Sequence, residues 1–372
     1  LWIALIGGVA LLAIRPFSEG LFRFMGHDRP DMQTVFAYEV SYFRILALGA
    51  APVILSSALS SFYSGLGRTW PVLWVSVAQT SVNIVLDWVL IFGRFGLPEM
   101  GMEGAALATV ISQVFVCVAY VVLLARRAND GPYRTLRGFG FDGALFRRLL
   151  RFGLPSGFHW LLDIAGFSLF LLLVGRLGEI PLAATNLAFN VNGVAFMPMI
   201  GIGTAVSVLV GQYLGRNRPD VAAAATWRGF WLASGYMGTI AAAYFFFPGL
   251  FIAPFASGGE PGALDETSAL AVTLLRFVAL YSLFDSMNII FASAVKGAGD
   301  TRFVMWLSAV LSFGLLVVPT WVSLVYLGRG VGTAWVLCTA YVCVLGVCFL
   351  LRFLGGKWKS MRVIEAPAGA VP

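Results

Sequence analysis

The sequence has few charged residues. Asp, Glu, Lys and Arg make up only 12% of the 372 residues, whereas hydrophobic residues make up 59%. Because an average soluble domain carries about 25% charged residues, this composition excludes an ordinary soluble protein and a disordered chain. The net charge of +7 does not indicate a nucleic-acid partner, since the basic residues lie between apolar runs rather than on one helix face. In a membrane protein they face the anionic cytoplasmic leaflet.

Histidine and cysteine are also scarce, with two and four copies. None of the cysteines belongs to a CxxC pair, and all lie in apolar runs, which predicts buried, reduced thiols: Cys117, Cys338, Cys343 and Cys348. Too few ligands remain for a metal site other than one for Na⁺. No P-loop sequence is present either, which excludes a built-in ATPase, and we expect no cofactor beyond a coupling Na⁺ or H⁺.

Long apolar runs dominate the chain instead. A hydrocarbon core about 30 Å thick requires about 20 apolar residues in a helix. Ten stretches meet this requirement: 1–15, 36–66, 70–93, 101–125, 149–175, 182–214, 228–256, 268–296, 303–327 and 330–353. The fold class predicted is therefore an all-α polytopic membrane protein.

The only long polar stretch, 126–148, predicts a basic cytoplasmic linker between two bundles. With this linker inside, 17 of the 25 Lys and Arg residues fall on the cytoplasmic side, as the positive-inside rule requires. The expected organisation is an N-terminal bundle at 1–125, a C-terminal bundle at 149–354 and a cytoplasmic tail at 355–372. The expected location is the inner cell membrane.

A shift of 232 residues aligns the chain with itself. Between 16–76 and 248–308, 14 of 61 positions are identical, whereas biased composition alone would give roughly five. An even number of helices separates the copies, which predicts a parallel repeat with a 6+6 architecture. In this alignment Leu1 pairs with Ala233, so nothing in the first copy corresponds to 149–232. We therefore expect ten helices here, with the first two of the architecture missing.

Acidic residues deep in these stretches are rare, and their insertion into a membrane is energetically unfavourable. They are therefore candidates for a functional role. Asp285 has Tyr281 four residues earlier and Asn288 three residues later, so all three share one helix face. A carboxylate with hydroxyl and amide oxygens beside it can bind Na⁺ or exchange a proton. The alternative is a structural carboxylate whose polar partners are supplied by a neighbouring helix.

Asp163 is a second deep acid, and His159 lies one turn before it. Two carboxylates from different helices could share a cation or a proton, because they cannot both ionise cheaply without a counter-ion. His159 alone is weaker evidence, because a lone histidine is more often a hydrogen-bonded packing residue than a group with a direct role.

An amide pair at Asn186 and Asn190 has i, i+4 spacing within another stretch. Amides in a membrane helix need partners or water. The pair is a candidate to line a cavity together with His159 and Asn288, or to join two helices.

Five segments together resemble the multidrug and toxic compound extrusion (MATE) transporters, and the resemblance spans about 1–353. They are SFYSGLGRTWPV at 61–72, GMEGAALATVISQ at 101–113, FGLPSGF at 152–158, FMPMIGIGTAVSVLVGQYLGRN at 196–217 and VKGAGDTR at 295–302. The order of these segments is specific, whereas any one alone is weak. The resemblance implies family helices three to twelve and export of organic cations in exchange for Na⁺ or H⁺.

The NorM-like branch of that family also suggests a cation site. Its acid ten residues after the Gly of G-L-P corresponds to Asp163, where Glu is common in the branch. Its Tyr-x-x-x-Asp corresponds to Tyr281 and Asp285. The resemblance thus implies a cation-binding or proton-coupling site at Asp163, Tyr281 and Asp285, with no catalytic residues. In another branch the key acid lies on helix one.

The expected function is secondary-active, cation-coupled antiport of drugs by a monomer that is not an enzyme. Its expected partners are small cationic amphipathic substrates and the lipid bilayer. Two alternatives stay open. A lipid-linked precursor flippase of the same superfamily would need basic residues in its cavity, and no Lys or Arg lies deep in these stretches. An intramembrane enzyme would need a tighter acid–base or metal cluster than His159 and Asp163 provide.

Overall fold

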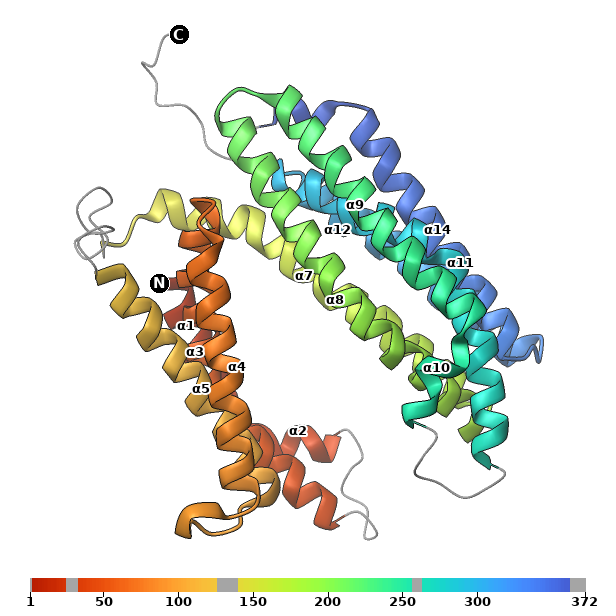
Figure 1. The fold of residues 1–372 in the computed structure, drawn as a ribbon, viewed down its shortest axis with the longest axis horizontal. Helices are drawn as coiled ribbons and strands as arrows, with labels where there is room; N and C mark the ends of the chain where they lie inside the picture. Colours follow the sequence, from red (N-terminus) through yellow and green to blue (C-terminus); the bar gives the residue numbers. More distant parts are fainter. Residues whose placement is uncertain (1, 25–32, 126–139, 256–262, 362–372) are drawn as a thin grey trace. The chain divides into compact units, whose positions relative to one another are not determined.

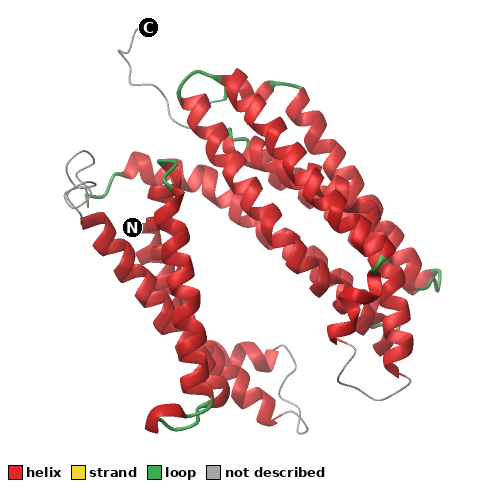
Figure 2. Cartoon of the chain, in the orientation of Figure 1, coloured by secondary structure: helices red, strands yellow, loops and turns green. Residues whose placement is uncertain are grey.

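The computed structural model describes residues 2–24, 33–125, 140–255 and 263–361. Every regular element in these ranges is a helix (Figure 2), which confirms the predicted all-α class. The chain divides into two compact units, Leu1–Phe146 and Arg147–Pro372. The predicted linker and tail lie partly outside the described residues, at 126–139 and 362–372.

The first unit is built around the long helix α3, which packs against α1 and α5 (Figure 1). Helix α4 packs mainly against α5. The helices of this unit are α1 (Trp2–Ile14), α2 (Ser18–Phe24), α3 (Gln33–Gly65), α4 (Thr69–Ile91) and α5 (Gly101–Ala125).

The second unit is built around α11, which packs against α8, α9 and α14 (Figure 1). Large side chains fill its core, among them Phe170, Met199, Phe291 and Trp335, all fully buried. The helices of this unit are α7 (Gly143–Gly175), α8 (Glu179–Gly215), α9 (Pro219–Phe246), α10 (Pro248–Ile252), α11 (Ala263–Gly297), α12 (Thr301–Leu311), α13 (Val318–Trp321) and α14 (Val331–Leu354).

Nine stretches of the described residues are helical, long and apolar enough to cross a membrane. Many large apolar side chains on these helices are exposed, including Leu172 at 68% and Trp306 at 65%. Exposed apolar surface on this scale is stable in lipid rather than in water. The protein is therefore a multi-pass membrane protein.

The predicted stretch at 228–256 is wrong at both ends. Helix α9 begins earlier, at Pro219, because proline suits a first helical position. It ends at Phe246, and Pro248 begins the short helix α10. Although α9 has the length of a membrane helix, it is not among the nine, since glycines, tyrosines and hydroxyl residues dilute its apolar content.

The predicted stretch at 303–327 is one continuous path in which α-helical and π-helical segments alternate. It begins as α12 and continues through a π-helical segment at Ser312–Val317, the short α13 and a second π-helical segment at Val322–Tyr326. Proline at 319 lacks an amide proton and disturbs the regular bond ladder, which favours such a local change.

The predicted repeat has a matching structure at the end of its central helices. After α3, the Gly67 amide donates to Ser64 and the Arg68 amide to Tyr63. After α11, the Gly299 amide donates to Lys296 and the Asp300 amide to Val295. Every residue pair here differs by 232, and both glycines have positive φ, at 72° and 98°. The duplicated sequence thus forms the same turn twice.

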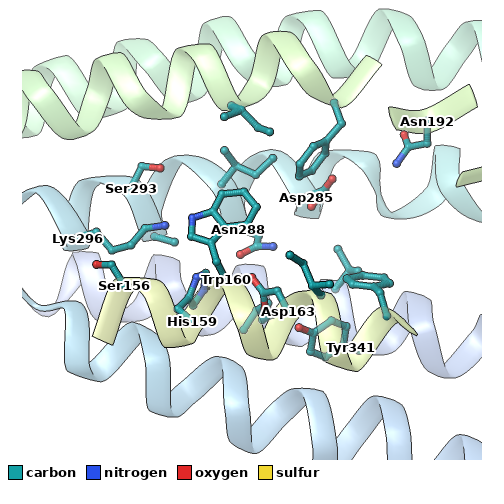
Figure 3. A pocket seen from close by; sticks show the side chains of 18 of the residues that line it. Ser156, His159, Trp160, Asp163, Asn192, Asp285, Asn288, Ser293, Lys296 and Tyr341 are labelled. Atoms are coloured by element: carbon teal, nitrogen blue, oxygen red, sulfur yellow. Dashed lines mark ion pairs between the residues drawn. The ribbon is translucent and has the colours of Figure 1, made fainter. Parts of the chain in front are cut away.

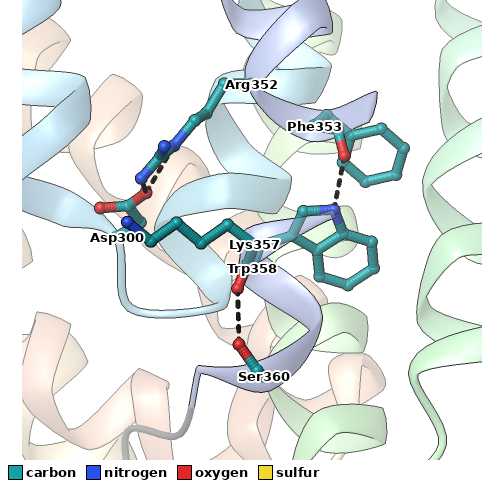
Figure 4. Close-up of polar contacts among 6 residues, drawn as sticks. All are labelled: Asp300, Arg352, Phe353, Lys357, Trp358 and Ser360. Atoms are coloured by element: carbon teal, nitrogen blue, oxygen red, sulfur yellow. Dashed lines mark hydrogen bonds and ion pairs between the residues drawn. The ribbon is translucent and has the colours of Figure 1, made fainter. Parts of the chain in front are cut away.

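The chain after α14 is anchored to the second unit (Figure 4). The Trp358 ring is 1% exposed and stacks 4.9 Å from the Phe353 ring, and its Nε1 donates to the Phe353 carbonyl over 2.8 Å. The residue before Phe353 is Arg352, whose Nε donates to Asp300 over 2.9 Å. The Trp358 contacts tie the start of the predicted tail to α14, and the Arg352 contact ties α14 to the turn before α12.

Candidate functional site

A cavity of about 730 Å³ lies within the second unit (Figure 3). Helices α7, α8, α11 and α14 all contribute to its wall. Most of the lining is apolar or aromatic, and a few polar groups converge on it, as in ligand sites generally. The polar lining residues that matter most below are His159, Asp163, Asn192, Tyr281, Asp285, Asn288 and Lys296.

Helix α7 contributes a histidine and an acid to the cavity. The Nε2 atom of His159 lies 3.5 Å from a carboxylate oxygen of Asp163, one turn later. The imidazole is buried, and its Nδ1 has no hydrogen-bond partner among the described residues. The side chain of Asp163 is 28% exposed, so an ion entering the cavity can reach it.

Helix α11 contributes the second acid. Asp285 is 6% exposed and Tyr281 is 4% exposed, and both line the cavity. Asn288 lines it as well (Figure 3). The i, i+4 and i, i+3 spacing thus directs three oxygen-bearing side chains to one space.

Two glycines allow the helices that form this wall to approach closely. A Cβ atom on Gly297 of α11 would collide with the Ser207 backbone of α8, and one on Gly346 of α14 would collide with the Phe284 carbonyl of α11. Because backbones meet at both points, the face of α11 toward the cavity is fixed. The close contact at Gly346 is with Phe284, the residue before Asp285. The close contact at Gly297 is at the residue after Lys296.

Aromatic rings hold α7 against its neighbours. The Phe167 ring lies 5.8 Å from Phe189 of α8 and 6.2 Å from Tyr341 of α14, both edge-on. Edge-to-face pairs at such separations stabilise beyond their buried area. All three rings line the cavity that also contains the two acids.

Lys296 is a cavity residue that the sequence analysis missed. As the last residue of the predicted stretch 268–296, it is one of the 17 basic residues predicted on the cytoplasmic side. The helix extends through Gly297, and the lysine lines the cavity with Ser156 and His159 (Figure 3). Its charge interacts with Asp163 without a direct ion pair. Lys296 therefore stands in the last turn of α11, as the sequence predicts, and also supplies the cavity with a basic residue.

The amide pair is not where the sequence analysis expected it. Asn186 and Asn190 are exposed on α8 and do not line this cavity, whereas Asn192 does. The cavity face of α8 runs through Phe189, Asn192 and Phe196. Asn190 stands two residues, or roughly half a turn, away from Asn192. The Oδ1 atom of Asn192 is buried with no partner among the described residues.

This arrangement suits a small hard cation. Two carboxylates, a phenol and two amides offer the oxygen ligands that such cations prefer. The same carboxylates can instead take up protons. The structure thus brings together every member of the predicted cation site, namely Asp163, Tyr281 and Asp285.

Comparison with known proteins agrees with this geometry. The MatE family model matches residues 1–89 and 155–322. The chain belongs to the MatE family. A "Probable multidrug resistance protein NorM" of Bradyrhizobium diazoefficiens is 31% identical over 95% of this chain and 75% of its own length. A protein of the same description from Thermotoga maritima is 25% identical over 98% of this chain and 76% of its own length.

Solved MatE structures share the fold. A structure described as an outward-facing multidrug resistance MATE family transporter has a TM-score of 0.86, at 20% identity, over 96% of this chain and 78% of that one. A MOP superfamily transporter from Pyrococcus furiosus has a TM-score of 0.83, at 19% identity, over the same shares. These likenesses confirm the fold, and the family match confirms the resemblance to MATE transporters that the sequence motifs indicate.

Proposed function

We propose that the protein is a secondary-active antiporter that exports organic cations in exchange for Na⁺ or H⁺. Its membership of the MatE family and its multidrug-resistance relatives support export of drugs. The single observation that favours cation coupling is the convergence of Asp163, Tyr281 and Asp285 on one cavity. Relatives of this family are transporters, and we propose no enzymatic activity for this chain.

Coupling requires that the ion prefer one conformation. A ligand shifts a two-state equilibrium only by its differential affinity for the two states. In this proposal a cation binds the carboxylates of Asp163 and Asp285 from outside and favours an outward-facing state that releases the drug. Return to the inward-facing state then carries the cation to the cytoplasm.

The cavity also has features of a site for amphipathic cations. Its volume of about 730 Å³ falls in the range of small-molecule pockets, about 300–1,000 Å³. Aromatic rings of Trp160, Phe167 and Tyr341 line it beside the acids. Such rings attract organic cations through their faces. A drug and a coupling cation would therefore compete for the same carboxylates, which is what exchange requires.

Lys296 bears on the flippase alternative, because a basic residue could hold a lipid-linked phosphate. The cavity nevertheless carries two acids against one lysine. Its net charge repels a multiply charged phosphate and favours a cation. Drug export therefore remains the function that the cavity favours.

The remaining assignments are proposals of the same kind. The charge bias of the loops supports the inner membrane with a cytoplasmic C-terminus. We propose that the protein works as a monomer in the lipid bilayer and needs no cofactor besides its coupling ion.

Efflux in drug-sensitive cells tests the function. Cells that express the gene for this chain should expel ethidium or a similar cation faster than cells with an empty vector. Asp285→Asn should remove this gain, whereas Asp87→Asn, at an acid of α4 outside the cavity, should retain it. No gain from the unaltered chain would refute drug export, and full efflux by Asp285→Asn would refute the site.

A further inference from the structure

The charges on the cavity wall do not cancel. Among the described lining residues, Asp163 and Asp285 are acidic and Lys296 is the one basic residue. The other titratable groups that face the cavity are His159, Tyr281 and Tyr341. With these three neutral, the wall carries one net negative charge.

The lysine is held at the cavity by the backbone around it. Gly297, the next residue, lies against the Ser207 backbone, so the last turn of α11 has little room to rotate. Lys296 is half-buried, and no hydrogen bond or ion pair of its ammonium is present among the described residues. Its charge nevertheless acts on both Asp163 and His159.

Lys296 and Asp285 are present in only one copy of the repeat. At positions 232 residues earlier, Ser64 replaces Lys296 and Val53 replaces Asp285. The turn that follows is nevertheless the same in both copies. The turn therefore forms without a lysine. Lys296 occurs in the copy of the repeat that also has Asp285.

An uncompensated charge in a membrane interior is costly, and such charges are paired. Before any ion arrives, the ammonium offsets one of the two carboxylates. One monovalent cation then completes neutrality, and a second would leave a net positive charge. We propose that Lys296 is a built-in counter-cation that limits the cavity to a single monovalent coupling cation. This inference rests on the cation coupling proposed above.

A structural explanation predicts something different. A lysine in the last turn of a helix can direct its ammonium to the membrane surface and toward the last carbonyls. In that case, the number of cations in the cavity does not depend on Lys296. Counting bound cations in variants therefore separates the two explanations.

The count is made on the purified full chain in detergent, by equilibrium dialysis with radioactive Na⁺ at alkaline pH, where protons compete little. The unaltered chain should bind one Na⁺. Lys296→Gln and Lys296→Met should bind two, because both carboxylates are then uncompensated. Lys296→Arg, which retains the charge, should bind one. Lys359→Gln, at an exposed lysine outside the cavity, is the matched control and should also bind one.

A double variant tests charge balance rather than direct contact. Asp163→Asn alone should bind no Na⁺, since Lys296 then balances Asp285. Asp163→Asn combined with Lys296→Gln should regain one Na⁺. A count of one Na⁺ in both neutral Lys296 variants would overturn the proposal. A count of zero or two Na⁺ in the unaltered chain would also overturn it. So would a double variant that binds no Na⁺. The predicted counts without ethidium efflux would instead refute only the proposed drug export.

Discussion

His159 and Asp163 lie one turn apart on the same face of α7, with the His159 Nε2 atom 3.5 Å from an Asp163 carboxylate oxygen. The separation exceeds an ordinary hydrogen bond, and a small movement of either side chain would form one. His159 is thereby placed to orient the acid that an entering cation would meet. It is a positioning residue in this account.

Replacement of His159 should weaken cation binding more than it weakens folding. His159→Ala removes the donor that orients Asp163, which costs about 1 kcal/mol, or roughly a fivefold rise in the half-saturating Na⁺ concentration. His159→Gln retains a donor and should restore most of the affinity. Efflux measured against cation concentration checks this. An equal loss in both variants would indicate packing alone.

The length of the acid at position 163 should matter less than its charge. Asp163→Glu retains the carboxylate, and the partly exposed side chain has room to extend into the cavity. It should keep cation-dependent efflux, whereas Asp163→Asn should lose it at least tenfold. Initial rates of ethidium efflux at several Na⁺ concentrations measure both. Retained cation dependence in Asp163→Asn would remove this residue from the site.

Gly297 should be intolerant of any side chain. Gly297→Ala places a Cβ atom into the Ser207 backbone, and such overpacking costs about 1–3 kcal/mol. Its repeat equivalent is the matched control, because a Cβ atom on Gly65 meets nothing within 4 Å. Thermal unfolding in detergent should show a lower midpoint for Gly297→Ala only. Equal midpoints for the two variants would contradict the close approach of α8 and α11.

The ion pair between Asp300 and Arg352 should contribute to stability (Figure 4). The Arg352 Nη2 lies 2.5 Å from Asp300 Oδ2, with side chains only 23% and 12% exposed. Asp300→Asn weakens charge-assisted hydrogen bonds that are worth about 1.5–3 kcal/mol. The exposed Arg218–Asp220 pair, with side chains 61% and 67% exposed, supplies the control, since exposed pairs contribute little.

Thermal unfolding of Asp300→Asn and Asp220→Asn measures this difference. The first variant should unfold several degrees lower and the second should match the unaltered chain. A similar midpoint for both variants would show that the connection between α14 and the turn before α12 does not stabilise the unit.

Much of the architecture follows from the sequence because apolar length and helix spacing are local properties. The predicted stretch at 101–125 coincides with α5, and Tyr281 and Asp285 reach one cavity because i, i+4 residues share a face. The turn after α11 matches the turn after α3 because the glycines of the repeat are in register.

Other features depend on which neighbour covers which helix face, and periodicity does not contain this information. Asn190 and Asn192 are both polar residues in one apolar helix, and only packing against α7 and α11 selects Asn192 for the cavity. Lys296 looks like a surface residue at the end of the predicted stretch 268–296, and only the helices around it show that it lines a cavity. The π-helical segments after α12 likewise give no sequence signal beyond the proline at 319.

Transport by the purified full chain in proteoliposomes tests the central claim most directly. An imposed Na⁺ or H⁺ gradient should drive ethidium against its own gradient, and replacing Asp285 with Asn should abolish this coupled movement while the protein remains folded. If neither gradient drives ethidium, or if the Asp285→Asn protein couples as well as the unaltered chain, the account of this cavity as the coupling site is contradicted.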